Sequence, residues 1–167
     1  MTHISNTKIG HFMLAVGMVV ENSSSGKILI QRRATEFQLG EWEIPYGRID
    51  QFEELTEAIS RELMEETALT QVTPMRLLRV WHFYRGEKSA ATDLYGLTFH
   101  CQTSQTEIRL SDEHSDYRWV TPIEAMKLIT LPGIRADVEI FQKWQQKNWQ
   151  NYQVTFGAIG EPKQYQL

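Results

Sequence analysis

The sequence predicts a sandwich of the α+β or α/β class, with a mixed β-sheet between helices. Segments typical of strands and of helices alternate in the order strands, helix, strands, helices. The 167 residues, 41% of them hydrophobic, suit one soluble domain with a substantial core. We therefore expect a single domain over residues 1–167, with a core at about 12–150 and a polar tail at 151–167.

The first half of the chain contains a predicted hairpin, a loop and a helix. The apolar run 12–20 and the segment 27–33 (KILIQRR) flank a polar turn that ends in Gly26, a pattern typical of a β-hairpin. Residues 36–52 contain glycine and proline breaks and should be mostly loop, with a short strand at 42–44. A helix is expected at about 54–67.

The second half predicts two long strands, a short strand and two helices. Residues 72–84 and 92–103 read as strands, and 116–120 as a short one. Thr121 is a candidate N-cap with Pro122 in the first turn, which starts a helix to about residue 129. The Leu-Pro-Gly segment at 131–133 should interrupt the helical structure. An amphipathic helix at 135–149 should place Trp144 and Trp149 on the sheet or in a homodimer contact.

The charge and the cysteine content of the chain limit the classes of partner and the cellular location that we expect. Lys and Arg number 17 and Asp and Glu 21, so the formal charge is 17 − 21 = −4, and we expect neither a nucleic acid polymer nor a membrane as partner. The longest apolar run, 12–20, is shorter than the ~20 residues of a membrane helix. Cys101 is the single cysteine, so a buried thiol and a cytoplasmic location are expected.

The stretch "AISRELMEET" (58–67) puts carboxylates where a helix should bury hydrocarbon. At about 100° per residue, Leu55 and Ile59 share a direction with Glu62 and Glu66, and Glu65 lies beside them. A solvated face is the simpler explanation, but other residues already supply that face: Glu57, Ser60, Arg61 and Met64.

Such a cluster needs positive charge to offset desolvation and repulsion. Arg61 is expected to point elsewhere and to pair with Glu53, as a structural contact. Mg²⁺ or Mn²⁺ prefers oxygen ligands, so a divalent metal site is predicted on this helix. Gly47 precedes the helix, permits unusual backbone angles, and belongs to a tight turn that would aim a carbonyl at the same ion.

These residues resemble the signature box of the Nudix hydrolases. Gly47, Glu53 and the run Arg61-Glu62-Leu63-Met64-Glu65-Glu66 match its charged positions, and similar flanking elements extend from Leu14 to Ala125. Three positions depart from the family pattern, in which glycine is usual: Tyr46, Phe52 and Ala68. A left-handed Ala68 would cost roughly 1 kcal/mol.

The resemblance implies an α/β/α sandwich of the Nudix fold and hydrolysis of a nucleoside diphosphate linked to another group, such as a nucleoside triphosphate. Mg²⁺ or Mn²⁺ would bridge the diphosphate and activate water for attack on phosphorus. It implies the metal ligands Glu62, Glu65, Glu66, Glu113 and the Tyr46 carbonyl. Glu62 or Glu113 would be the general base, and Arg33, Glu43 and Ile44 would contact the nucleotide.

Two other functions remain open at this point. An isomerase of an isoprenoid diphosphate on the same fold would need a catalytic cysteine, for which Cys101 in a strand is a poor candidate. A non-catalytic nucleotide sensor can lose box carboxylates, which are all present here. The aromatic run at 81–84 is interpreted as core, with base stacking as the alternative.

Overall fold

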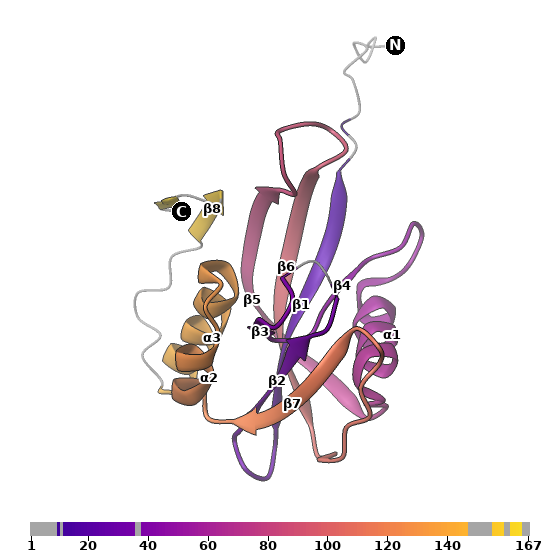
Figure 1. The fold of residues 1–167 in the computed structure, drawn as a ribbon, viewed down its shortest axis with the longest axis vertical. Helices are drawn as coiled ribbons and strands as arrows, with labels where there is room; N and C mark the ends of the chain where they lie inside the picture. Colours follow the sequence, from indigo (N-terminus) through magenta and orange to yellow (C-terminus); the bar gives the residue numbers. More distant parts are fainter. Residues whose placement is uncertain (1–9, 11, 36–37, 147–154, 159–160, 165–167) are drawn as a thin grey trace, which may run out of the picture.

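The computed structural model describes residues 10, 12–35, 38–146, 155–158 and 161–164. Within these residues, seven strands form one mixed sheet flanked by helices, and two further strands pair near the C-terminus (Figure 1). The sheet contains β1 (Met13–Asn22), β2 (Ile28–Arg33), β3 (Trp42–Glu43), β4 (Tyr46–Arg48), β5 (Val72–Tyr84), β6 (Asp93–Thr103) and β7 (His114–Val120). The other elements are α1 (Leu55–Thr67), α2 (Pro122–Leu128), α3 (Pro132–Gln145), β8 (Thr155–Ala158) and β9 (Glu161–Gln164).

The sheet is mixed, as predicted. Its strand order is β3-β2-β1-β6-β5, with β4 paired to β1 and β7 paired to β2. β1 and β6 are parallel from Met13↔Leu94 to Asn22↔Thr103, and the other described pairs are antiparallel. The predicted hairpin between β1 and β2 is present, and Gly26 closes its turn with φ 66°.

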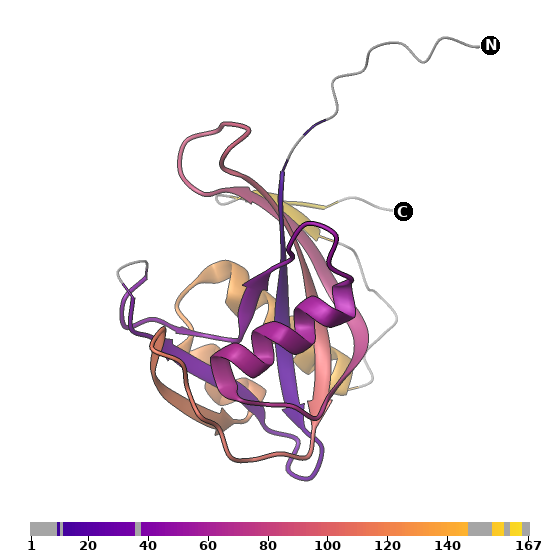
Figure 2. The same cartoon turned by 90° about the vertical axis from the view of Figure 1, so that its right-hand side faces the viewer.

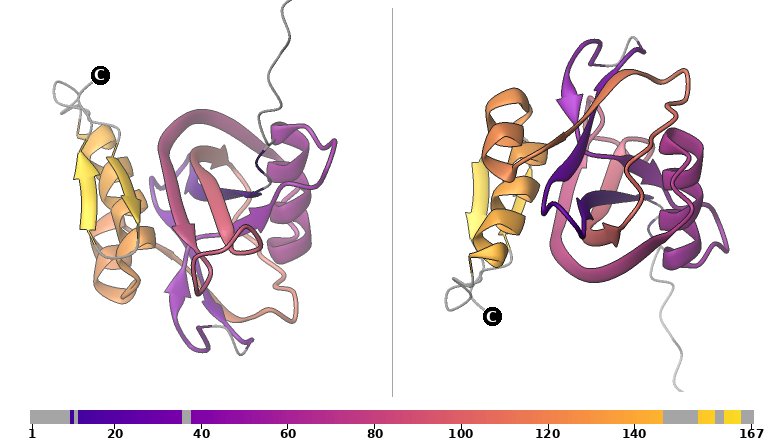
Figure 3. Two further views of the ribbon diagram at one scale, coloured as in Figure 1. Left: turned by 90° about the horizontal axis from the view of Figure 1, so that it is seen from above. Right: turned by 90° about the horizontal axis from the view of Figure 1, so that it is seen from below.

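Helices cover both faces of the sheet, which confirms the predicted sandwich. α1 lies on one side, and α2 and α3 lie on the other (Figures 1 and 3). Alternate side chains of β1 serve the two cores: Val16 and Met18 pack with Ile59 and Leu63 of α1, whereas Val19 packs with Phe141 of α3. Figure 2 shows α1 crossing the strands.

Some predicted boundaries were wrong. The loop predicted at 36–52 includes β4, and α3 begins at Pro132 instead of residue 135. Proline is well tolerated in the first turn of a helix, so the Leu-Pro-Gly segment starts α3 and does not merely break the chain. α1 begins after Glu54, which forms a capping box with Glu57.

The aromatic predictions have mixed outcomes. Trp81 is buried beside Tyr46 and Phe83, so this member of the aromatic run is core, whereas His82 and Tyr84 are half-buried. Trp144 packs near His100 on the sheet, and Trp149 lies outside the described residues. No helix among the described residues is long and apolar enough to span a bilayer.

Candidate active site

The inner side of α1 changes from hydrocarbon to carboxylate, as its helical phase predicts. Ile59 and Leu63 are buried in the core, and Glu66, one turn further on, is only 6% exposed. Glu62 is half-buried, whereas Glu65 is exposed. Glu62 and Glu66 therefore lie at the edge of the α1 core, and Glu65 faces solvent.

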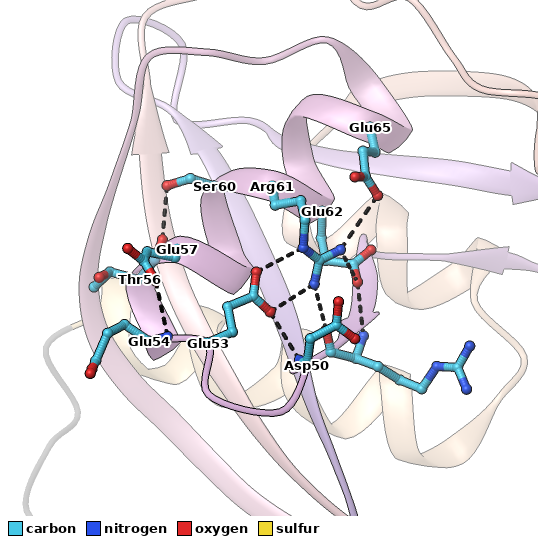
Figure 4. A network of polar contacts seen from close by, with 10 residues as sticks. Asp50, Glu53, Glu54, Thr56, Glu57, Ser60, Arg61, Glu62 and Glu65 are labelled. Carbon is cyan, nitrogen blue, oxygen red and sulfur yellow. Dashed lines mark hydrogen bonds and ion pairs between the residues drawn. The ribbon is translucent and has the colours of Figure 1, made fainter.

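Arg61 and Glu53 form the predicted ion pair in a fork-to-fork geometry (Figure 4). Arg61 Nε donates to Glu53 Oε1 at 2.7 Å, and Nη2 donates to Oε2 at 2.9 Å. The Asp50 N–H also donates to Glu53, at 2.9 Å. These donors lower the pKa of Glu53 to about 2, so it stays ionised and fixes the loop to the helix.

Arg61 also contacts Glu62, which corrects the expectation that it points elsewhere. Its Nη1 lies 2.9 Å from Glu62 Oε1 and 3.4 Å from Glu65 Oε2. The Arg48 N–H donates to the same Glu62 oxygen at 3.0 Å. Burial raises the pKa of Glu62, while Arg61 and the Arg48 N–H oppose that rise. Arg61 thus orients Glu62 as well as Glu53.

Gly47 is required for close approach, because a Cβ atom there would overlap the Glu62 carboxylate. The unusual backbone angle expected at Gly47 is not found, since its φ is not among the positive values in the described chain.

The register of β4 leaves the Tyr46 carbonyl on the edge of the strand that does not bond to β1. Met18 N–H donates to Pro45 O and Ile49 N–H to Leu14 O, so Tyr46 and Arg48 occupy the positions that do not bond to β1. Arg48 uses that free edge to bind Glu62 and Arg61. Tyr46 carries its carbonyl on the same edge, while its ring lies over Gly17.

Glu66 is the most perturbed carboxylate of the box. Burial is the main reason that its pKa is raised, to about 8, and the nearby carboxylates of Glu43, Glu62 and Glu113 add to the effect. Gln31 Nε2 donates to Glu66 Oε2 at 2.7 Å and partly opposes the rise. Glu66 therefore lies in a negative, poorly solvated position with a neutral donor as its hydrogen-bond partner.

Glu113 is brought to this end of α1 by a loop that is distant in the sequence. The Ser111 N–H donates to Glu66 O at 3.1 Å, and the Arg109 N–H donates to Thr67 O at 3.1 Å. The Ala34 N–H donates to Glu113 O at 2.7 Å, and the Glu113 side chain is exposed. The exposed carboxylate is close enough to raise the pKa of Glu66.

The three predicted nucleotide contacts differ in accessibility: Arg33 ends β2, Glu43 ends β3, and Ile44 follows β3. Arg33 Nη1 donates to Glu43 Oε1 at 2.9 Å, and Nη2 donates to the Thr35 hydroxyl at 3.0 Å. Glu43 is buried, and the Ile44 side chain lies fully in the core. A ligand could therefore reach Ile44 only through its backbone. These roles stay predictions.

Sequence analysis missed two buried polar residues: Gln31, which donates to Glu66, and His114, which contacts Gln31. Gln31 lies on the face of β2 that α1 covers, since Leu29, two residues earlier, packs with α1. His114 Nε2 lies 2.8 Å from Gln31 Nε2 and 3.0 Å from Glu43 Oε1. The signal for Gln31 was a polar residue at an inward position directly after the apolar run Ile28–Ile30.

The chemistry of the donor set fits a hard divalent cation, although the carboxylates are not gathered into one cage. In the part of the chain that the structure describes, no three His, Cys, Asp or Glu side chains form a group that could hold a metal ion. The crowding of acids that raises the pKa of Glu66 is the condition that a cation would relieve. The predicted ligand set stays a prediction.

Comparisons with known proteins identify the family. The profile of the NUDIX domain matches residues 11–141. The nucleoside triphosphatase NudI of Escherichia coli (strain K12) is 32% identical over 90 residues, which cover 50% of this chain and 63% of that protein. The chain thus spans about 63% of the length of the curated relatives that it matches.

Solved structures share the fold. A MutT protein from Methanosarcina mazei Go1 has a TM-score of 0.64 and 23% identity, and covers 84% of this chain and 98% of its own. A NUDIX hydrolase from Nitrosomonas europaea has a TM-score of 0.70 and 19% identity. The match covers 90% of this chain and 80% of that hydrolase. Since the family profile matches more than half of its residues, the chain belongs to the Nudix family.

Proposed function

We propose that the protein is a divalent-metal-dependent pyrophosphohydrolase that hydrolyses a nucleoside diphosphate linked to another group, such as a nucleoside triphosphate. The observation that carries this proposal is the buried Glu66, whose pKa is raised to about 8 by burial and by three neighbouring carboxylates. The similarity to a nucleoside triphosphatase supports a small nucleotide substrate. A reducing cytoplasm suits the single buried thiol.

In this proposal Glu62, Glu65, Glu66, Glu113 and the Tyr46 carbonyl would hold Mg²⁺ or Mn²⁺. Once bound, the ion supplies charge that neutralises a diphosphate and acidity that ionises water. Arg61 and the Arg48 N–H fix the Glu62 carboxylate. Glu113 or Glu62 accepts the proton of the attacking water, and Arg33 provides a cation for a phosphate or base.

An isomerase with a catalytic thiol is disfavoured. Cys101 is the single cysteine of the chain, it is fully buried in β6, and burial raises its pKa to about 12. A thiol in that position is neither accessible nor ionised at neutral pH.

The test is a panel of nucleotides with Mg²⁺ or Mn²⁺, scored by phosphate release after added pyrophosphatase. Glu66→Gln should lower turnover by orders of magnitude, about 10²-fold or more, while the fold persists. Glu57→Gln, an exposed glutamate on the same helix, is the matched control and should retain turnover.

Each alternative predicts a different outcome. Near-normal turnover in Glu66→Gln would remove Glu66 from the mechanism. Nucleotide binding without turnover under either metal would favour a sensor, and conversion of isopentenyl diphosphate without phosphate release would favour an isomerase.

A further inference from the structure

Gln31 is a fully buried glutamine that none of the predicted site roles uses. Its amide nitrogen lies 2.7 Å from Glu66 Oε2 and 2.8 Å from His114 Nε2. Among the described residues, its Oε1 is buried without a hydrogen-bond partner. Both of these contacts of the side chain therefore run through the nitrogen.

A purely structural role explains this side chain poorly. An apolar residue at this position would continue the packing of Leu29 beneath α1 and would leave no carbonyl unsatisfied. A buried acceptor without a partner is unfavourable, because it gives up its hydrogen bonds to water and gains none in the protein. The carbonyl of the Gln31 amide is thus unfavourably buried, and the favourable contact of the amide is the hydrogen bond from its nitrogen to Glu66.

The contacts continue from Gln31 toward the predicted nucleotide residues. The register Gln31↔Glu43 places β3 beside it, and His114 Nε2 lies 3.0 Å from Glu43 Oε1. Glu43 Oε1 in turn accepts from Arg33 Nη1 at 2.9 Å. His114, Glu43 and Gln31 are buried, so water screens these contacts weakly.

We infer that Gln31 is a positioning residue of the metal centre. Its amide N–H donates to one oxygen of Glu66 and leaves the other for the divalent ion. His114 Nε2 lies against the same amide nitrogen and either accepts from Gln31 or donates to Glu43, so the positioning role rests on the bond from Gln31 to Glu66. The inference rests on the proposed function, because the orientation of Glu66 matters to a ligand only if Glu66 binds the ion.

The test is the affinity of the nucleotide-free protein for Mn²⁺, measured by electron paramagnetic resonance of the free ion. Gln31→Met keeps a side chain of similar length and removes the donor. Loss of a residue that orients a ligand typically weakens metal binding 10–100-fold, so we expect about tenfold weaker binding. Turnover should also need about tenfold more Mn²⁺ for half-saturation and approach the wild-type value at saturating Mn²⁺.

Gln102→Met is the matched control. Gln102 Nε2 also donates to a buried glutamate, Glu21 Oε2, at 2.9 Å, on the face of the sheet that bears His100. The same chemical change there should leave Mn²⁺ affinity as in the wild type. A general loss of stability would lower binding in both variants and would overturn the inference.

The outcomes separate the inference from the proposed function. Unchanged Mn²⁺ affinity in Gln31→Met, while Glu66→Gln loses binding, overturns the positioning role and leaves the function standing. A wild-type protein that binds no Mn²⁺ overturns both. If Gln31→Met does not fold, His114→Phe removes the contact on the other side of the amide. That variant should show a smaller weakening, and wild-type affinity in it would overturn the inference.

Discussion

Glu66 and Asp137 are both buried carboxylates, one on each face of the sheet, and their neighbours differ in charge. Asp137 of α3 is fully buried, accepts from Arg79 Nε at 2.5 Å and accepts a short bond from the Tyr46 hydroxyl. Glu66 accepts from the neutral Gln31 and lies near three carboxylates. Burial raises both pKa values, but a cation opposes the rise only at Asp137.

The difference distinguishes a structural acid from a candidate ligand. The Asp137 network is complete: Arg79 also donates to Gly133 O at 2.9 Å, and the Tyr46 ring fills the space above Gly17. It anchors β4, the strand that carries the Tyr46 carbonyl, to α3. Glu66 has no comparable counter-charge among the described residues, so we expect it to gain one by binding a cation.

The largest expected effect is opposite stability changes at the two acids. Asp137→Asn leaves Arg79 without its charged partner and should lower the free energy of unfolding by about 3 kcal/mol. Glu66→Gln removes a repelled charge and should leave the metal-free protein at least as stable as the wild type at pH 8. Urea denaturation with a chelator present measures both. A comparable loss of stability in the two variants would contradict the distinction.

The second prediction concerns pH. The pKa of Glu66 is raised from 4.5 to about 8 in the folded chain, so its favourable contribution is complete below pH 4.5. That contribution is lost as the pH rises toward 8, by at most about 1.36 kcal/mol per pH unit. Urea denaturation of the metal-free protein between pH 5 and 8 should therefore show a steeper decline in the wild type than in Glu66→Gln. Added Mn²⁺ should restore stability at pH 8 in the wild type alone, and parallel curves would refute the assignment.

Helical periodicity predicted that Glu66 lies on the buried face of α1, because the direction of a side chain on a helix depends only on its position along that helix. Residues 55, 59, 62 and 66 share a direction whatever the rest of the chain does. The contacts of Glu66 could not be read in the same way. Gln31 meets Glu66 only because α1 packs on β2, which joins positions 35 residues apart, and His114 meets Gln31 because β2 pairs with β7. Asp137 was missed for the same reason: its partners lie on β4 and β5.

The short strand β4 and the second contact of Arg61 also could not be predicted from the local sequence. β4 has three residues beside Pro45, and its place is set by pairing with β1. Arg61 was expected to contact Glu53 alone, since periodicity gives the direction of a side chain and not the reach of a long one. Its guanidinium extends back to Glu62 as well.

A third prediction tests whether the unfavourable burial of the Glu66 charge depends on the backbone at the end of α1. Ala68 ends α1 in the left-handed region, with φ 58° and ψ 21°, where the family usually has glycine. Ala68→Gly should raise the free energy of unfolding by roughly 1 kcal/mol. Because the change is two residues from Glu66 but alters no charge, the gain should be equal from pH 5 to 8. A pH-dependent gain would mean that the helix end and the Glu66 environment are coupled.

The smallest expected effect is at Phe52, the other left-handed position where the family usually has glycine. Its φ is 69°, and its side chain is 95% exposed, so no packing is lost when the ring is removed. Phe52→Gly should stabilise the chain by only about 0.5 kcal/mol, because an exposed loop shares backbone strain more easily than a helix end. Mn²⁺ affinity should not change, since Arg61 and the Asp50 N–H already hold Glu53 next to this position. A shift in Mn²⁺ affinity in Phe52→Gly would mean that the shape of this loop, and not only the set of carboxylates, determines how the site binds its ion.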